Sequence, residues 1–292
     1  MTRILLFYKY VTIEDPEALQ AWFVRTASEL NLVGRVLVAE EGVNGTLEGT
    51  VADTEAFERA LLNDARFSDV DVKRSEGTGT AFKKLSVKVR DEIVGTHFPK
   101  EKADPRVRTA PHLPAEELKQ WYASGKDFVV VDMRNDYEYQ SGHFEGSVNP
   151  GLEASRDLPQ AMPLLAPLKN QTVVTVCTGG IRCEKMSAYL LSEGFTDVYQ
   201  LENGIHTYME KYPGQDFKGA LYTFDERKVM HFGGDREIVG TCKLCNEPTE
   251  LYVNCANDFC HMHFLACAAC QGEHGTPCSE ACRSAVAASA SS

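Results

Sequence analysis

Two kinds of hydrophobic periodicity alternate along the first hundred residues. Alternating apolar positions predict strands, and apolar positions at helical spacing predict helices. Strands are predicted at residues 3–11, on both sides of "EEGVNG" within 34–49, at 69–75 and at 85–94. Helices are predicted at 15–30, with Asp15 as N-cap and Pro16 at the first helical position, and at 53–64. The order β-α-β-β-α-β with one extra strand predicts a ferredoxin-like (acylphosphatase-like) α+β sandwich over residues 1–98.

Uniformly apolar strands mark a second domain. The segments "FVVVDM" and "TVVTV" lack polar alternation, as expected of parallel strands that are covered on both faces. The helices "PAEELKQWYAS" and "CEKMSAYLLSEG" and the strand "DVYQL" accompany them. We therefore predict an α/β domain with a parallel sheet over residues 113–212. The segments 99–112 and 213–236 are predicted linkers, and residues 284–292 are predicted to form a disordered tail.

The chain is acidic overall but locally basic. Its 292 residues carry a formal charge of −12, which argues against general affinity for nucleic acid. Residues 83–108 hold eight basic residues and four acidic ones, a local charge of +4. Such a stretch suits a selective contact with a polyanion, and it equally suits a solvated linker. No segment approaches the roughly 20 apolar residues that span a bilayer, and the N-terminal apolar run is too short for a signal peptide, so we expect a soluble, cytoplasmic protein.

The loop "CTGGIR" places Cys177 between an apolar strand and a helix, with Arg182 five positions later. Two glycines allow successive backbone N–H groups to converge on one point, and the positive end of the helix faces the same point. We therefore predict a lowered pKa for Cys177 and a site that stabilises a persulfide or an oxyanion, with Arg182 adding its charge. Cys183 either resolves an oxidised Cys177 or fills space in the core, and packing is the favoured interpretation.

This loop resembles the active-site loop of rhodanese domains. The flanking segments "VVVDMRNDYEYQSGHFEGSVNP" and "VYQLENGIHTYME" resemble the rest of that fold's signature. The resemblance implies that the six residues from Cys177 to Arg182 accommodate sulfur, since related phosphatases have one residue more to fit phosphate. It also implies structural roles, holding the scaffold of the loop, for four residues at signature positions: Asp132, Arg134, Glu138 and His143.

Eight cysteines crowd into residues 237–283, which we predict to be a zinc-binding module. They form four closely spaced pairs: Cys242 and Cys245, Cys255 and Cys260, Cys267 and Cys270, Cys278 and Cys282. In a reducing compartment this pattern favours two closed, structural Zn²⁺ sites over disulfides. The connection "HMHFLA" should separate the two sites, because an extended segment of that length spans about 20 Å. Sequential pairing and a cross-brace both stay open, and neither His261 nor His263 is needed as a ligand.

Read as a whole, the chain resembles the bacterial tRNA uridine hydroxylase (TrhO) family. The resemblance runs from "EEGVNG" through "KKLSVKVRDEIVGTH" and "VCTGGIRCEK" to "YVNCANDFCHMHF". It implies oxygen-dependent conversion of the wobble uridine, tRNA position 34, to 5-hydroxyuridine, with O₂ as co-substrate and Cys177 as catalytic cysteine. It also implies contact with the anticodon loop, for which the basic stretch offers Lys83, Lys84, Lys100 and Lys102.

Two other classes of function stay open at the level of sequence. The central loop alone suggests a sulfurtransferase that carries persulfide sulfur to a thiol or tRNA acceptor. A non-catalytic adaptor is disfavoured, because a retired site would not need an intact "CTGGIR" loop. The sequence has neither a flavin fingerprint nor a recognisable two-His-one-carboxylate iron site, and it does not indicate an electron donor.

Overall fold

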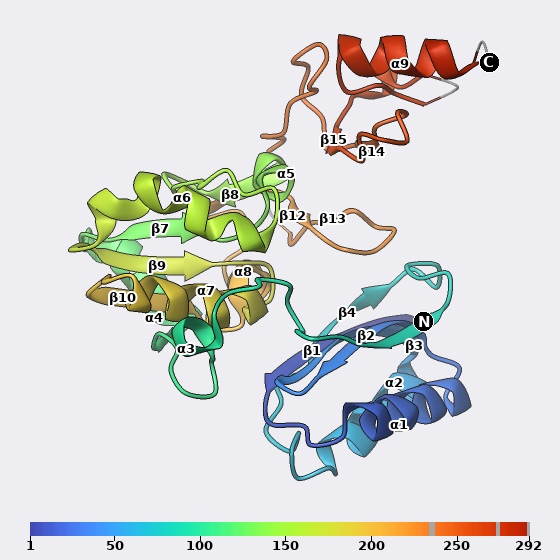
Figure 1. Cartoon of the computed structure of the whole chain (residues 1–292), viewed down its shortest axis with the longest axis vertical. Helices are drawn as coiled ribbons and strands as arrows, with labels where there is room; N and C mark the ends of the chain where they lie inside the picture. The colour runs from blue at the N-terminus through green and yellow to red at the C-terminus, as the bar shows by residue number, and fades with distance from the viewer. Residues whose placement is uncertain (234–236, 273–274, 291–292) are drawn as a thin grey trace.

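The computed structural model describes residues 1–233, 237–272 and 275–290. It shows an N-terminal domain, a central domain and a cysteine-rich C-terminal module, coloured in turn from blue to red in Figure 1. The sheet of the N-terminal domain has its two helices on one side, and its other side is turned toward the central domain. Among the described residues, no helix is both long and apolar enough to span a membrane.

The N-terminal domain is a five-stranded sheet with two helices. Its elements are β1 (Thr2–Tyr10), α1 (Pro16–Glu29), β2 (Val33–Ala39), β3 (Gly42–Thr50), α2 (Val51–Leu62), β4 (Lys73–Gly77) and β5 (Leu85–Val89). The spatial order is β4-β1-β3-β2-β5, antiparallel except for the pair of β2 with β5. The order of elements along the chain is the predicted one. The strands predicted at 69–75 and 85–94 are shorter in the structure, because β4 begins only at Lys73 and β5 ends at Val89.

Strict alternation divides the side chains of this sheet between two faces. Leu5 and Phe7 on β1 and Val36 and Val38 on β2 are fully buried against the helices. Phe57 of α2 lies in the same core. The alternate positions on each strand face the central domain, so this sheet is covered on both sides over part of its area.

The central domain contains a parallel sheet of order β6-β10-β9-β7. Its strands are β6 (His112–Leu113), β7 (Val129–Asp132), β9 (Thr172–Val176) and β10 (Asp197–Leu201). Its helices are α4 (Ala115–Ser124), α5 (Asp136–Ser141), α6 (Leu158–Leu165), α7 (Ile181–Ser192) and α8 (Gly204–Lys211), with 3₁₀ turns at Ser155–Asp157 and Ala166–Leu168. Separate hydrophobic clusters lie on the two faces of the sheet, as the uniformly apolar strands predicted.

Both predicted linkers contain regular structure. Residues 99–112 include α3 (Lys100–Ala103), which packs against α7, and the first residue of β6. Residues 213–236 include β11 (Phe217–Gly219), which pairs with β8 (Gly142–Phe144), and the hairpin of β12 (Leu221–Tyr222) with β13 (Val229–Met230). The linker prediction for 213–236 is therefore wrong over the strands, because their apolar side chains find cover on the central domain, and residues 234–236 lie outside the described residues.

The cysteine-rich module has little regular structure before its final helix. It comprises the antiparallel pair β14 (Tyr252–Asn254) and β15 (His263–Leu265), a 3₁₀ turn at Ala268–Cys270, and α9 (Glu280–Ala290). The prediction of a disordered tail is wrong for residues 284–290, and 291–292 lie outside the described residues. The alanine-rich sequence has high helix propensity, and the Ser279 hydroxyl accepts the N–H of Cys282 at the start of α9.

Candidate active site

The loop after β9 is built to surround the sulfur of Cys177 with donors. The N–H of Gly180 donates to Cys177 Sγ at 3.2 Å. Two carbonyls of the loop face away from the sulfur: those of Cys177 and Thr178 accept the N–H groups of Ile205 and His206 at 2.9 and 3.0 Å. Because the start of α8 holds these carbonyls outside, the loop N–H groups are left to face inward.

Two glycines make this approach geometrically possible. Gly180 has a φ of +100°, and a Cβ there would come within 2.7 Å of the Tyr8 hydroxyl. Gly204 has a φ of +71°, and a Cβ there would lie within 2.6 Å of the Cys177 carbonyl oxygen. Any side chain at either position would push the loop away from its neighbour.

The electrostatics favour the thiolate of Cys177. Burial raises the pKa of this thiol, but the hydrogen bond from the Cys183 thiol and the positive charge of Arg182 outweigh it, and the pKa falls to about 6. Burial and the neighbouring Cys177 raise the pKa of Cys183 well above its usual range. The two buried cysteines are therefore not equivalent, since Cys183 acts as a protonated donor to Cys177.

Arg182 is itself held by a buried carboxylate. Its guanidinium donates to both oxygens of Glu138, at 2.5 and 2.8 Å, and to the Thr178 hydroxyl at 3.1 Å. Glu138 also accepts the backbone N–H of Asn135, which closes the capping box at the start of α5. The resemblance gave Glu138 a role in holding the scaffold of the loop, and these contacts agree with that role.

The other signature residues also hold the scaffold. Arg134 is fully buried and donates to both oxygens of Asp132 and to the carbonyl of Gly142. The His143 ring stacks on Tyr139 with centroids 4.0 Å apart. None of these side chains lines the cavity between the N-terminal and central domains.

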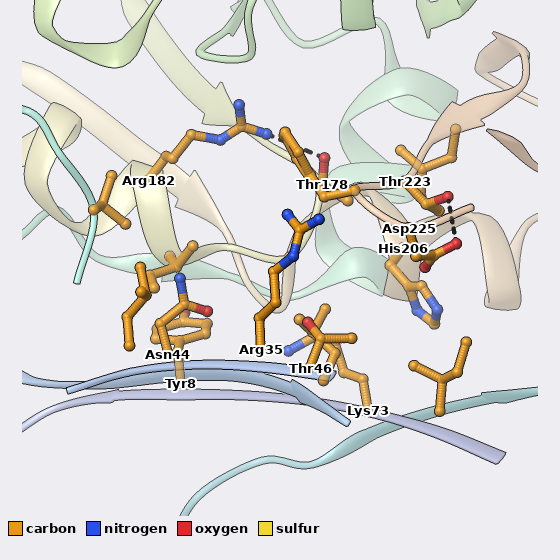
Figure 2. Close-up of a pocket in the computed structure, with 18 of the residues that line it drawn as sticks. Tyr8, Arg35, Asn44, Thr46, Lys73, Thr178, Arg182, His206, Thr223 and Asp225 are labelled. Carbon is orange, nitrogen blue, oxygen red and sulfur yellow. Dashed lines mark hydrogen bonds between the residues drawn. The ribbon is translucent and has the colours of Figure 1, made fainter. Parts of the chain in front are cut away.

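The loop forms one wall of a cavity between the N-terminal and central domains (Figure 2). The cavity has a volume of about 570 Å³, a size typical of small-molecule sites. Thr178, Gly179, Ile181 and Arg182 line it from the loop, and the β12–β13 hairpin adds a further wall. The floor is the face of the N-terminal sheet that the helices leave uncovered. The Cys177 residue is fully buried beneath the loop and does not itself line the cavity.

Comparison with known proteins places this arrangement in a family. Family models match residues 2–93 (UPF0176 acylphosphatase like domain), 114–211 (Rhodanese-like domain) and 218–283 (Rhodanase C-terminal). Proteins named tRNA uridine(34) hydroxylase from Bacillus velezensis, Staphylococcus saprophyticus and Enterococcus faecalis are 41%, 42% and 42% identical to this chain. Each alignment covers 96% of this chain and 88%, 89% and 89% of the respective relative. The chain belongs to the tRNA uridine(34) hydroxylase family.

In this tRNA uridine(34) hydroxylase family member, the four lysines suggested by the basic stretch lie in two places. Lys83 and Lys84 are exposed, directly follow the cavity residue Phe82, and have no ion-pair partner in the part of the chain that the structure describes. Lys100 and Lys102 lie on α3, where Lys102 pairs with Glu193 at 2.8 Å. The sequence grouped the four together, but the fold separates them.

The eight C-terminal cysteines of this family member form two groups of four. One group is Cys242, Cys245, Cys267 and Cys270, and the other is Cys255, Cys260, Cys278 and Cys282. Within each group the sulfur atoms all lie within 4.8 Å of one another. Along the chain, the first cysteine pair thus combines with the third and the second pair with the fourth. This is the cross-braced alternative. As predicted, the connection between Cys260 and Cys267 separates the groups.

The sulfur geometry fits a tetrahedral metal ion. Three sulfur pairs, one in the first group and two in the second, are 3.6, 3.5 and 3.7 Å apart. A tetrahedral ion with metal–sulfur bonds of about 2.3 Å requires sulfurs about 3.8 Å apart. A disulfide would need about 2.05 Å, and all ten cysteines are free. His263 instead stacks on Tyr252 and His261 is exposed, so neither joins the groups.

Sequence reasoning did not identify the floor of the cavity as part of the site. Tyr8, Arg35, Asn44, Thr46 and Lys73 project into it from the N-terminal sheet (Figure 2). A signal was present in β1, where Ile4, Leu6 and Tyr8 are as apolar as the alternate positions that form the core. An apolar second face on a sheet indicates that something covers it.

Proposed function

We propose that this protein hydroxylates uridine 34 of tRNA to 5-hydroxyuridine, with O₂ as the oxidant. One observation carries the proposal: a thiol with a pKa of about 6 lies behind the wall of a nucleotide-sized cavity, in a chain that matches hydroxylases of this name over nearly its full length. As tRNA would be the substrate, we infer that the protein acts in the cytoplasm.

Cys177 is the proposed catalytic residue. At neutral pH its sulfur is largely anionic and therefore nucleophilic, which its protonated neighbour Cys183 is not. The Gly180 N–H, the start of α7 and Arg182 stabilise the anion, and the same groups would stabilise a persulfide on that sulfur.

The tRNA is proposed to contact exposed lysines in two places, beside the cavity and on α3. Lys83 and Lys84 lie next to the cavity residue Phe82, and Lys100 and Lys102 extend the contact along α3. Because the chain carries a charge of −12, these local cations would select where on the surface a polyanion binds. The anticodon loop is the part of the tRNA that must reach the cavity, as position 34 lies in it.

The N-terminal domain and the cysteine-rich module are proposed to support the active site without contributing a catalytic residue. The strand order β4-β1-β3-β2 supports a ferredoxin-like assignment for the N-terminal domain. Each C-terminal cysteine group is proposed to hold one Zn²⁺, with four thiolates and therefore no open position for a substrate. Zinc binding would supply folding free energy to a module that is too small to bury much core.

The test is mass spectrometry of tRNA nucleosides from cells with and without the gene. Deletion should remove 5-hydroxyuridine and its derivatives from position 34 unless a second pathway supplies them. Cys177→Ala and Cys177→Ser should both fail to restore it, since a serine hydroxyl is not ionised at neutral pH. Product formed under ¹⁸O₂ should carry the heavy isotope.

If the protein were instead a sulfurtransferase, the same nucleoside analysis should give the opposite result. The loop that lowers the pKa of Cys177 would also hold a persulfide, so this alternative rests on the same site. It predicts normal 5-hydroxyuridine in the deletion strain and thiosulfate-dependent transfer of sulfur from Cys177 to an acceptor. Unchanged 5-hydroxyuridine in a strain without a second pathway would end the hydroxylase proposal.

A further inference from the structure

The cavity floor is the part of one face of the N-terminal sheet that β4, β1, β3 and β2 form. Side chains at alternate positions of four strands line it: Ile4, Leu6 and Tyr8 on β1, Arg35 and Leu37 on β2, Asn44 and Thr46 on β3, Lys73 and Ser75 on β4. The positions between them pack against α1 and α2. This face therefore offers a mainly apolar surface with a few separated polar groups, which is the composition of a ligand site.

Most of the cations around the cavity are already paired with carboxylates. Arg182 pairs with Glu138 at 2.5 Å, and two further pairs follow the same pattern: Arg227 with Asp225 at 2.7 Å and Lys73 with Asp71 at 3.3 Å. His206 also lines the cavity, but burial and then the charges of Lys73 and Arg227 lower its pKa to about 4, so it is neutral.

Arg35 differs from these cations. Over the part of the chain that the structure describes, its guanidinium has no carboxylate within ion-pair distance and makes no hydrogen bond. It rises from β2 into the cavity in the direction of the Cys177 loop (Figure 2). A solvated guanidinium in this position can bind an incoming phosphate without first breaking an internal ion pair.

Asn44 is oriented by the protein. Its Nδ2 donates to the carbonyl of Ile93 at 3.1 Å, which fixes the direction of the side-chain amide. The oxygen Oδ1 then has no donor among the described residues, although Asn44 lines the cavity. The cavity thus presents an acceptor of fixed direction on its floor.

A fixed acceptor distinguishes uracil from cytosine. The N3 atom of uracil carries a hydrogen and donates, whereas N3 of cytosine has a lone pair and would be repelled by Oδ1. A base can reach such a pocket only if it leaves the stack, as bases of single-stranded loops do most easily.

We propose that this sheet face reads the target nucleotide: Asn44 Oδ1 accepts the N3–H of the uracil, and Arg35 binds a phosphate that flanks it. The inference rests on the proposed function and names the residues that select its substrate. It also gives "EEGVNG" a role, because Asn44 is the asparagine of that segment.

The test measures binding alone. Two anticodon stem-loop RNAs that differ only in uridine or cytidine at position 34 are titrated with the full-length protein, by fluorescence anisotropy. The unmodified protein should prefer the uridine RNA. Asn44→Leu should weaken binding of the uridine RNA by about tenfold, since one hydrogen bond to the base is lost, and it should not weaken binding of the cytidine RNA, since the repulsion of cytosine N3 is removed. Asn44→Ala gives the same contrast should the leucine variant fail to fold.

Arg35→Ala has a different expected signature. Both RNAs should bind more weakly by the same factor, and the slope of log affinity against log salt should decrease by about 0.7, the value of one phosphate contact with a single strand. Arg25→Ala is the matched control, because Arg25 is exposed on α1, which covers the opposite face of the sheet. That control should change neither quantity.

Equal binding of the two RNAs by the unmodified protein would overturn the inference, as would an equal loss for both RNAs in Asn44→Leu and Asn44→Ala, or an unchanged salt slope in Arg35→Ala. Binding does not require turnover, so the result is independent of the nucleoside analysis. A protein that prefers the uridine RNA through Asn44 but forms no 5-hydroxyuridine would retain this inference and lose the proposed hydroxylation.

Discussion

At the scale of single residues, the reactivity of Cys177 depends on a second cysteine as well as on Arg182. The Cys183 thiol donates to it and lowers its pKa. Cys183→Ala should therefore shift the pH profile of Cys177 alkylation upward from a midpoint near 6, and labelling at pH 6 should slow by about tenfold.

Cys183→Ser is the matched control for this prediction. Its hydroxyl still donates, so the midpoint should stay closer to that of the unmodified protein. The measurement is peptide mass spectrometry after pulses of iodoacetamide across pH. If Cys183→Ala leaves the midpoint in place, the hydrogen bond does not control the thiolate.

At the scale of elements, a buried lysine of α7 makes ion pairs with the N-terminal domain and the segment that follows it, beside the hydrogen bonds from Tyr8 and Tyr10 to the same helix. Lys185 is 5% exposed in its side chain and contacts Glu41 at 2.8 Å and Glu92 at 3.2 Å. Lys185→Met should lower the free energy of unfolding by about 3 kcal/mol, because it leaves two carboxylates facing each other without a cation. Lys211→Met, which breaks the exposed pair with Glu116, should cost less than about 1 kcal/mol in the same urea titration. Similar losses in both variants would contradict the role of Lys185.

The interleaving of the cysteine pairs can be tested by counting metal ions. Cys245→Ser with Cys267→Ser alters one group, so this double variant should keep one zinc per chain. Cys245→Ser with Cys255→Ser alters both groups and should lose both ions. Sequential pairing predicts the reverse, and elemental analysis of the purified variants decides between the two arrangements.

At the scale of the whole molecule, the separation of the lysines predicts unequal contributions to tRNA binding. Removing Lys83 and Lys84 together should weaken binding and decrease the salt slope by about 1.5, because they follow the cavity residue Phe82 and neither has an ion-pair partner among the described residues. Removing Lys100 and Lys102 should decrease it less, since Lys102 already pairs with Glu193. Affinity measured across salt concentrations, with Lys211→Ala as control, tests the order. A larger effect from the α3 pair would place the RNA elsewhere.

Local sequence determined much of the secondary structure of this protein and the form of the Cys177 loop. The period of the apolar positions predicted the order of strands and helices in the N-terminal domain, because side-chain direction in a strand or helix follows from backbone geometry alone. In the central domain the sequence patterns predicted β7, β9, β10, α4 and α7, but not the shorter elements between them. The Cys177 loop was predictable for the same reason: its glycines, its arginine and the following helix are neighbours along the chain. The alanine-rich segment after Cys282 was wrongly predicted to be disordered, because its composition suits both a disordered tail and a helix. Packing within the cysteine-rich module decides between the two.

Only the tertiary structure decided what lies opposite the loop. Arg35 and Asn44 are more than 130 positions from Cys177, and no local pattern says that their sheet face turns toward it. The same holds for the cysteine module, where spacing within each pair is local but the combination of pairs is set by how the hairpin and α9 fold back. Helices and strands are determined by residues that are neighbours in the sequence. A site between domains is determined by which surfaces pack against each other and exclude water, and those surfaces are distant in the sequence.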